Sequence, residues 1–115
     1  MAHAGVPVGD RNVEAEILLR RFLGPDGVAF GREFVEKSRE VLPKITRDKT
    51  AEKIDDEDAL AKIASDIRFA LAHLAFLEGT LEAMRICQGI NSDFAGFAAA
   101  SMVIVMDAVR SIKSA

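Results

Sequence analysis

Hydrophobic residues recur every three or four positions along one long stretch of the chain, residues 58–90. One stripe repeats at seven-residue spacing over about four heptads, as in a helix that packs along its whole length. A second stripe lies between these positions, where an ordinary surface helix is polar. Such a helix has to bury two sides, so we expect it to lie in the middle of a bundle or to be shared within an oligomer. The first stripe is Leu60, Ile63, Ile67, Ala70, Leu74, Leu77, Leu81 and Met84, and the second is Phe69, Ala72, Phe76, Ala83 and Ile86.

A shorter amphipathic helix is predicted near the N-terminus, ending at Leu23. Asp10 or Asn12 is expected to cap it, because short polar side chains accept hydrogen bonds from the free N–H groups at a helix start. Gly24 and Pro25 then form a stop signal, with Gly24 in the left-handed position after the helix.

A second amphipathic helix follows after a very short turn. Asp26 is expected to cap it, and it runs to about Leu42, with Pro43 ending or bending it. The densely charged residues 44–58 have few large apolar side chains, so we expect a linker or one loose helical turn there. The acidic residues 55–58 complement the helix dipole and mark the start of the long helix.

The last predicted helix is apolar on all sides. Between residues 94 and 109 the only charged residue is Asp107, and small residues are frequent, so we expect burial on every side. An apolar run of this length is shorter than the about 20 residues that a membrane span needs. Asn91 or Ser92 is expected to cap this helix.

These elements predict an all-α, bundle-like single domain of four helices, residues 10–115, preceded by a flexible arm, residues 1–9. The connection 89–92 is short, so the long third helix and the apolar fourth helix form a hairpin. The other helices are too short to cover the third, so apolar surface stays exposed in one chain. We therefore expect a homodimer in which two hairpins form a four-helix core. The expected interface residues are Leu74, Leu77, Leu81, Met84, Phe94, Phe97 and Met102.

Charge and cysteine content narrow the cellular setting. The net charge of −3 gives no overall attraction to nucleic acid, and we expect neither nucleic-acid nor membrane binding. The single cysteine, Cys87, cannot form an internal disulfide, and residues 1–9 lack the segments of a signal peptide, so a cytoplasmic location is predicted. Because the dipole at a helix end disfavours a thiolate, we expect Cys87 to be a small buried hydrophobe.

Metal and cofactor chemistry is not indicated. The chain has two histidines, His3 and His73, too few for a histidine-based cluster. Glu78 and Glu82 share a helix face, but the Glu-x-x-His pair of di-iron bundles is missing. We interpret both as a solvated strip with Arg85, and we predict no metal and no cofactor.

One short motif indicates a catalytic alternative. Residues 68–73, Arg-Phe-Ala-Leu-Ala-His, form an Arg-x4-His pattern that resembles the signature of the HEPN superfamily, all-helical bundles that often cleave RNA. The resemblance covers these six residues only, and Phe69 stands where a polar residue commonly follows the arginine. It implies a ribonuclease in which Arg68 holds a phosphate and His73 moves a proton. Without the resemblance, the residues themselves favour His73 as a partly buried side chain at the boundary of a bundle.

The sequence favours a non-enzymatic interaction protein, an adaptor, regulator or assembly factor that acts through an oligomeric bundle. Its partner is expected to be itself, with another protein as a second partner class. The HEPN-like ribonuclease is one alternative. A carrier of an apolar ligand, held between the last helix and Phe69 or Phe76, is the other.

Overall fold

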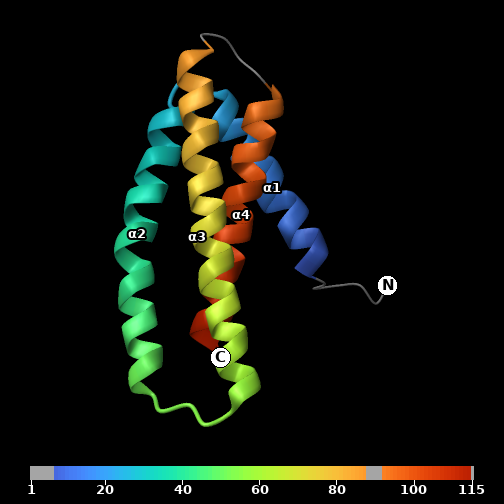
Figure 1. Ribbon diagram of the computed structural model, residues 1–115. Coiled ribbons are helices and arrows are strands. Elements are labelled where there is room, and N and C mark those ends of the chain that lie inside the picture. Colours follow the sequence, from blue (N-terminus) through green and yellow to red (C-terminus); the bar gives the residue numbers. More distant parts are fainter. Residues whose placement is uncertain (1–6, 88–91, 115) are drawn as a thin grey trace.

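The protein consists of four α-helices in the computed structural model, which describes residues 7–87 and 92–114, with side chains from 13–87 and 93–114. In chain order they are α1 (Pro7–Leu23), α2 (Gly27–Ala51), α3 (Glu57–Ile86) and α4 (Ser92–Ser114) (Figure 1). The described residues contain no strand, so the all-α prediction is confirmed. Predicted features in residues 1–6 and 88–91, including His3 and the Asn91 cap, lie outside the described residues.

α1 begins earlier than predicted and ends in a tight corner. Pro7 is its first residue, a position that suits proline because the missing N–H has no helical partner there. Asp10 and Asn12 therefore lie inside the helix, and the prediction that one of them caps it is wrong. Gly24 does not take the predicted left-handed conformation; its N–H donates to the carbonyl of Arg21 at 3.1 Å.

α2 is longer than predicted, because it continues through Pro43 to Ala51. Leu42 and Ile45 are both buried on either side of the proline, so packing holds the helix together across the lost backbone hydrogen bond. The hydroxyl of Thr46 also donates to the Leu42 carbonyl at 2.8 Å. Asp26 precedes the helix as predicted, but its side chain makes no capping hydrogen bond.

α3 begins at the acidic run, as predicted. The Asp56 carboxylate accepts hydrogen bonds from the N–H of Asp58 at 2.9 Å and of Ala59 at 3.4 Å, and Glu57 and Asp58 occupy the positive first turn. The helix ends at Ile86, and Cys87 follows it as an exposed, free thiol. The predicted burial of Cys87 is therefore wrong, because the chain leaves the packed helix one residue earlier.

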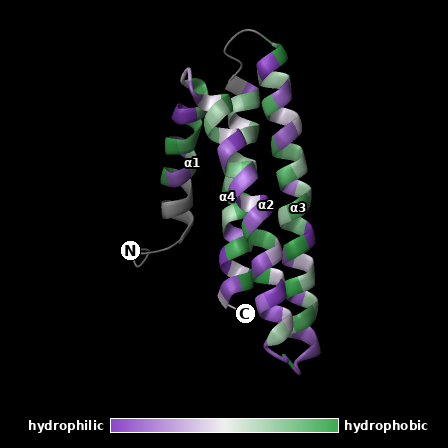
Figure 2. Ribbon diagram, turned by 90° about the vertical axis from the view of Figure 1, so that its left-hand side faces the viewer, coloured by the Kyte–Doolittle hydropathy of each residue, from purple (hydrophilic) through white to green (hydrophobic). Residues whose placement is uncertain are grey.

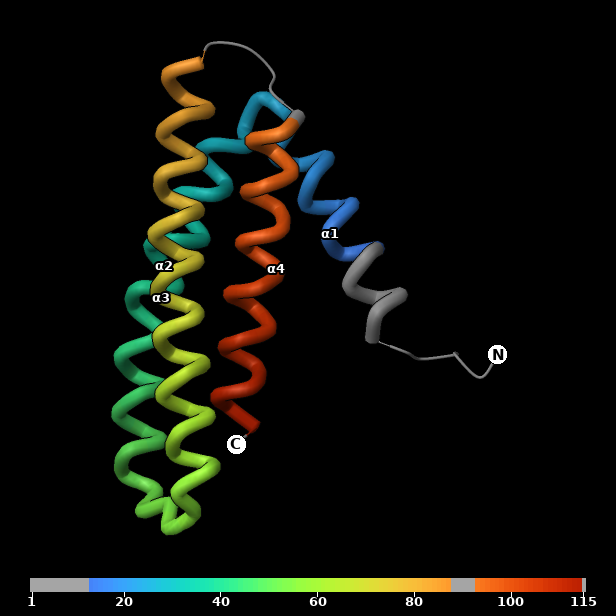
Figure 3. The backbone as a smooth tube through the Cα atoms, turned by 45° about the vertical axis from the view of Figure 1, so that its right-hand side comes forward, coloured from blue at the N-terminus to red at the C-terminus, as the bar shows by residue number. Residues whose placement is uncertain are grey.

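The core lies between α3, α4 and α2. α3 packs most extensively against α4, and α2 lies along its other side. The C-terminal part of α1 packs on α4. The N-terminal part of α1 diverges from the other three helices (Figure 3). The radius of gyration, 15.8 Å, exceeds the about 13 Å of a compact chain near this size, so the single chain is open in shape. The largest fully buried side chains are Phe22, Leu74, Leu77, Leu81, Met102, Val105 and Ile112.

α4 is the core helix that its composition predicted. Its inner residues, among them Ala98, Met102 and Val105, are almost fully buried. By length and composition alone, residues 93–114 would suffice to cross a membrane, but half of the apolar window is already buried inside the chain. Burial is not complete on every side, however, since the Phe97 side chain is 50% exposed.

Candidate functional site

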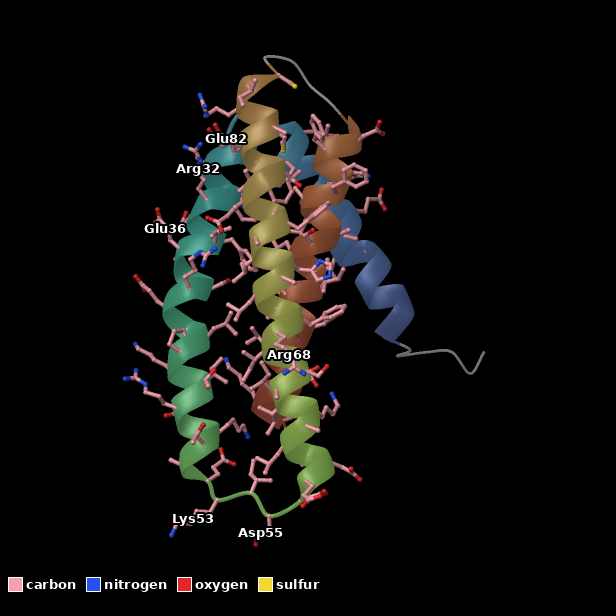
Figure 4. The ribbon with its side chains drawn as sticks, in the orientation of Figure 1. Arg32, Glu36, Lys53, Asp55, Arg68 and Glu82 are labelled. Carbon is pink, nitrogen blue, oxygen red and sulfur yellow. The ribbon has the colours of Figure 1, made fainter. Side chains whose placement is uncertain are left out.

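The charged residues in the body of α3 lie mainly on two sides of the helix, one toward α2 and one toward α4. On the side toward α2, Glu78 pairs with Arg39, and Glu82 lies 3.6 Å from Arg32 while also pairing with Arg85 (Figure 4). The hydrogen bond from Arg85 is the main reason that the pKa of Glu82 lies below its ordinary value. All three pairs are exposed; Glu78–Arg39 and Glu82–Arg32 link α3 to α2, whereas Glu82–Arg85 lies within α3.

On the side toward α4, a second polar group ties the two helices together. The Ser111 hydroxyl donates to the Asp66 carboxylate at 2.7 Å, and the Lys62 ammonium donates to both, at 2.6 Å to Ser111 and 3.1 Å to Asp66. Asp66 is only 20% exposed on its side chain. The charged side chains on both borders of α3 therefore pair with residues of the neighbouring helices.

The side of α3 between these two borders, here called the outer face, has almost no charge. At about 100° per residue its members form one stripe that runs from Ala61, one turn after the acidic start of α3, to the end of the helix. All of them are exposed except the half-buried Ala83, and Arg68 is the only charged one. Hydrophobic residues recur along the whole of α3 (Figure 2). The outer face consists of Ala61, Ser65, Arg68, Phe69, Ala72, Ala75, Phe76, Gly79, Ala83 and Ile86.

Aromatic rings form the border of the outer face with α4. The side chains of Phe69 and Phe76 are 53% and 52% exposed, although both are large and apolar. Phe97 of α4 stands beside Phe76, with ring centroids 6.2 Å apart in an edge-to-face arrangement. A contiguous apolar patch with half-exposed aromatic rings is typical of a surface that meets another protein.

Small residues form the centre of the outer face. Gly79 lies in the C-terminal third of α3, inside the helix, and a Cβ at this position would meet nothing within 4 Å. Such a glycine lowers helix stability by about 1 kcal/mol relative to alanine, with no packing reason inside the chain. Together with Ala72 and Ala75 it leaves a low, flat strip on the helix surface, which another helix can approach closely.

The predicted interface residues lie mostly inside the single chain. Leu74, Leu77, Leu81 and Met102 are at most 2% exposed and contact the chain's own helices. Met84 and Phe94 are half-buried, and Phe97 is the exposed member of the set. The surface that a partner can reach is therefore the second stripe of α3, which carries Phe69 and Phe76, and not the first.

Arg68 and His73, the catalytic pair implied by the HEPN resemblance, lie on different sides of α3. Five residues along a helix turn the side chain by about 140°, so Arg68 points to solvent while His73 is half-buried toward α4. The His73 ring contacts the Phe69 ring in a tilted arrangement, with centroids 4.8 Å apart and an interplanar angle of 51°. Its Nδ1 atom is buried without a hydrogen-bond partner among the described residues. Within one chain the two side chains do not converge on a shared site.

Two grooves border α4. One, about 320 Å³, lies beside Phe69 where an apolar ligand was predicted, and Asp66 and Asp107 contribute to its wall. The other, about 370 Å³, lies between α2 and α4, with Phe34, Val41, Val105, Met106 and Val109 as its apolar lining and Lys37, Arg110 and Lys113 at its rim. The described residues contain no group of three or more His, Cys, Asp or Glu side chains that could hold a metal ion.

The chain matches no protein-family model, no curated protein and no solved structure. The outer face of α3 and the adjoining edge of α4 are therefore the features of the molecule that bear on its function.

Proposed function

We propose that this protein is a small, non-enzymatic interaction protein that works as a homodimer in the cytoplasm. The observation that carries the proposal is the unpartnered outer face of α3, with Phe69 and Phe76 half-exposed beside Phe97 of α4. Covering this face with the same face of a second chain brings two α3–α4 hairpins together as a four-helix arrangement. The exposed free thiol of Cys87 is consistent with a reducing compartment.

The test is the concentration dependence of the molecular mass, measured by sedimentation equilibrium. We expect the wild-type protein to exceed the monomer mass at micromolar concentration. Burying a whole phenylalanine contributes about 1.5–3 kcal/mol, and roughly half of each Phe76 is still exposed, so two copies together contribute about 1.5–3 kcal/mol. Phe76→Ala should therefore raise the dissociation constant on the order of 10- to 150-fold.

Ile17→Ala is the matched control, because Ile17 is similarly exposed, at 59%, but lies on α1. It removes a comparable apolar side chain outside the outer face and should leave the dissociation constant unchanged. A wild-type protein that stays monomeric at these concentrations overturns the proposal.

A second candidate function is the binding of an apolar ligand. The groove between α2 and α4 favours it, because its volume of about 370 Å³ lies in the range of small-molecule sites. Native mass spectrometry of freshly purified protein should then show an apolar adduct, and a consistently bare chain counts against this function. RNA cleavage has no comparable support, since the side chains of Arg68 and His73 point to different sides of α3. This function would require that the wild-type protein cleaves RNA and that His73→Ala abolishes cleavage while the oligomer stays intact.

A further inference from the structure

We propose that two copies of the outer face pack antiparallel, with the two-fold axis beside Leu74, so that each phenylalanine of one α3 enters a gap beside a small residue of the other. This arrangement rests on the proposed homodimer and goes beyond it, because it assigns the orientation, the register and the closing ion pair. The partner is a second copy of this chain, and the reason is the self-complementary order of large and small residues along α3.

The order of residues around Leu74 is what makes the face complementary to itself. In an antiparallel two-fold pair, a residue a given number of positions before the axis faces the residue that number of positions after it. Phe69 lies five before and Gly79 five after, while Ala72 lies two before and Phe76 two after. Each ring therefore faces a small residue, and the contact is formed twice.

The helical surface also supplies a suitable gap for each ring. In knobs-into-holes packing, a side chain enters a space formed by four residues of the facing helix. For Phe69 that space is formed by the partner's Phe76, the partner's Gly79, the partner's Thr80 and the partner's Ala83. Because a Cβ at Gly79 would meet nothing within 4 Å in the single chain, the space is open, and the position without a side chain is where the ring needs room.

The same register extends to both ends of the outer face. Ser65 and Ala83 lie nine residues before and after Leu74 and face each other as two small residues. Ile86, twelve residues after Leu74 and 63% exposed, faces the partner's Lys62. The match of one large residue against one small residue therefore holds for Phe69 and Phe76, and the small Ser65 and Ala83 flank these contacts over about five turns of helix.

Charge distinguishes the antiparallel from the parallel orientation. Arg68 is the only charged residue of the outer face, and it is exposed. In an antiparallel pair, Arg68 lies on the α2 border next to the partner's Glu82, on the same flank of the interface. In a parallel pair, each Arg68 faces its own counterpart, and like charges at close range repel. Two Arg68–Glu82 pairs therefore close the antiparallel interface at symmetric positions.

Disulfide cross-linking tests the orientation directly. With Cys87→Ser as background, the variants Ser65→Cys and Ala83→Cys are oxidised separately and as an equimolar mixture. We expect a cross-linked dimer in the mixture, formed between one chain of each kind, and none from either variant alone. Two copies of the same position would lie about 27 Å apart along the helix, too far for a disulfide.

The outcomes separate the two proposals. Cross-linking of each variant with itself, and not between the two, shows a parallel pair and overturns the antiparallel register. A dimer by sedimentation that cross-links in neither experiment overturns the outer face as the interface. A protein that is monomeric by sedimentation overturns the proposed function itself, independently of the register.

Discussion

Gly79→Ala separates the stability of the single chain from the stability of the dimer, because the two should change in opposite directions. Gly79 lies inside α3, two turns before its end, and an added methyl group would meet nothing within 4 Å in the single chain. Alanine loses less backbone entropy than glycine on folding, so the isolated chain should gain about 1 kcal/mol. Urea unfolding of dilute protein measures this gain.

The dimer should respond in the opposite sense. In the antiparallel register the new methyl group points into the gap that the partner's Phe69 occupies, and overpacking of this kind costs about 1–3 kcal/mol per contact. Two such contacts form per dimer, so even the lower limit raises the dissociation constant on the order of 30-fold. Sedimentation equilibrium of the variant and the wild type measures this change.

Gly96→Ala is the control for helix propensity alone. Gly96 lies inside α4, and a Cβ there also meets nothing within 4 Å, but it is outside the proposed contact. It should stabilise the chain to a similar extent and leave association unchanged. A Gly79→Ala variant that associates as tightly as the wild type would refute the packing of Phe69 against Gly79.

Two further predictions concern the single chain. Leu74→Ala should lower the free energy of unfolding by about 2–5 kcal/mol, because Leu74 is fully buried and the neighbouring helices can only partly close the cavity. Urea unfolding of dilute protein measures this loss, and a free energy of unfolding equal to that of the wild type contradicts it. Since the hydrogen bond from Arg85 lowers the pKa of Glu82, this carboxylate stabilises the fold above the unfolded value of about 4.5, and the stabilisation is lost as the pH falls through the lowered pKa. Glu82→Gln should accordingly weaken the fall in urea midpoint with acidification, and an unchanged acid slope would count against an Arg85–Glu82 contribution.

The helices themselves could largely be predicted from the sequence. The seven-residue repeat identified α3, and the residues of its first stripe from Ile63 to Leu81 lie in the core or border it, while Leu60 at its start is 45% exposed. The acidic start of α3 was predicted correctly because four consecutive acidic residues place a capping carboxylate at whichever of them the helix begins. α2 was underestimated because local propensity predicts a break at Pro43, whereas burial of Leu42 and Ile45 against the other helices holds the helix together.

The candidate site could be predicted only in part, for a physical reason. The sequence showed two apolar stripes on α3 but not which of them the chain itself covers. That choice depends on contacts between residues far apart in the sequence. Leu74, Leu77 and Leu81 are buried against the other helices, and this burial sets the rotation of α3, since exposed ion pairs contribute little. The larger aliphatic residues of the first stripe were therefore predicted as the interface, although they form the core.

The division of α3 into a covered and an uncovered stripe also explains why an exposed face stays so apolar. Lys62, Asp66, Glu78 and Glu82 are all directed to the borders with α4 and α2, where they pair. A face selected only for contact with water has no reason to lack charge between these borders, since exposed charged residues keep a monomer soluble. A face that packs on a second copy has a reason, because each charge buried there without a partner is costly. Arg68 is the exception that fits this argument, because an antiparallel copy places a carboxylate beside it.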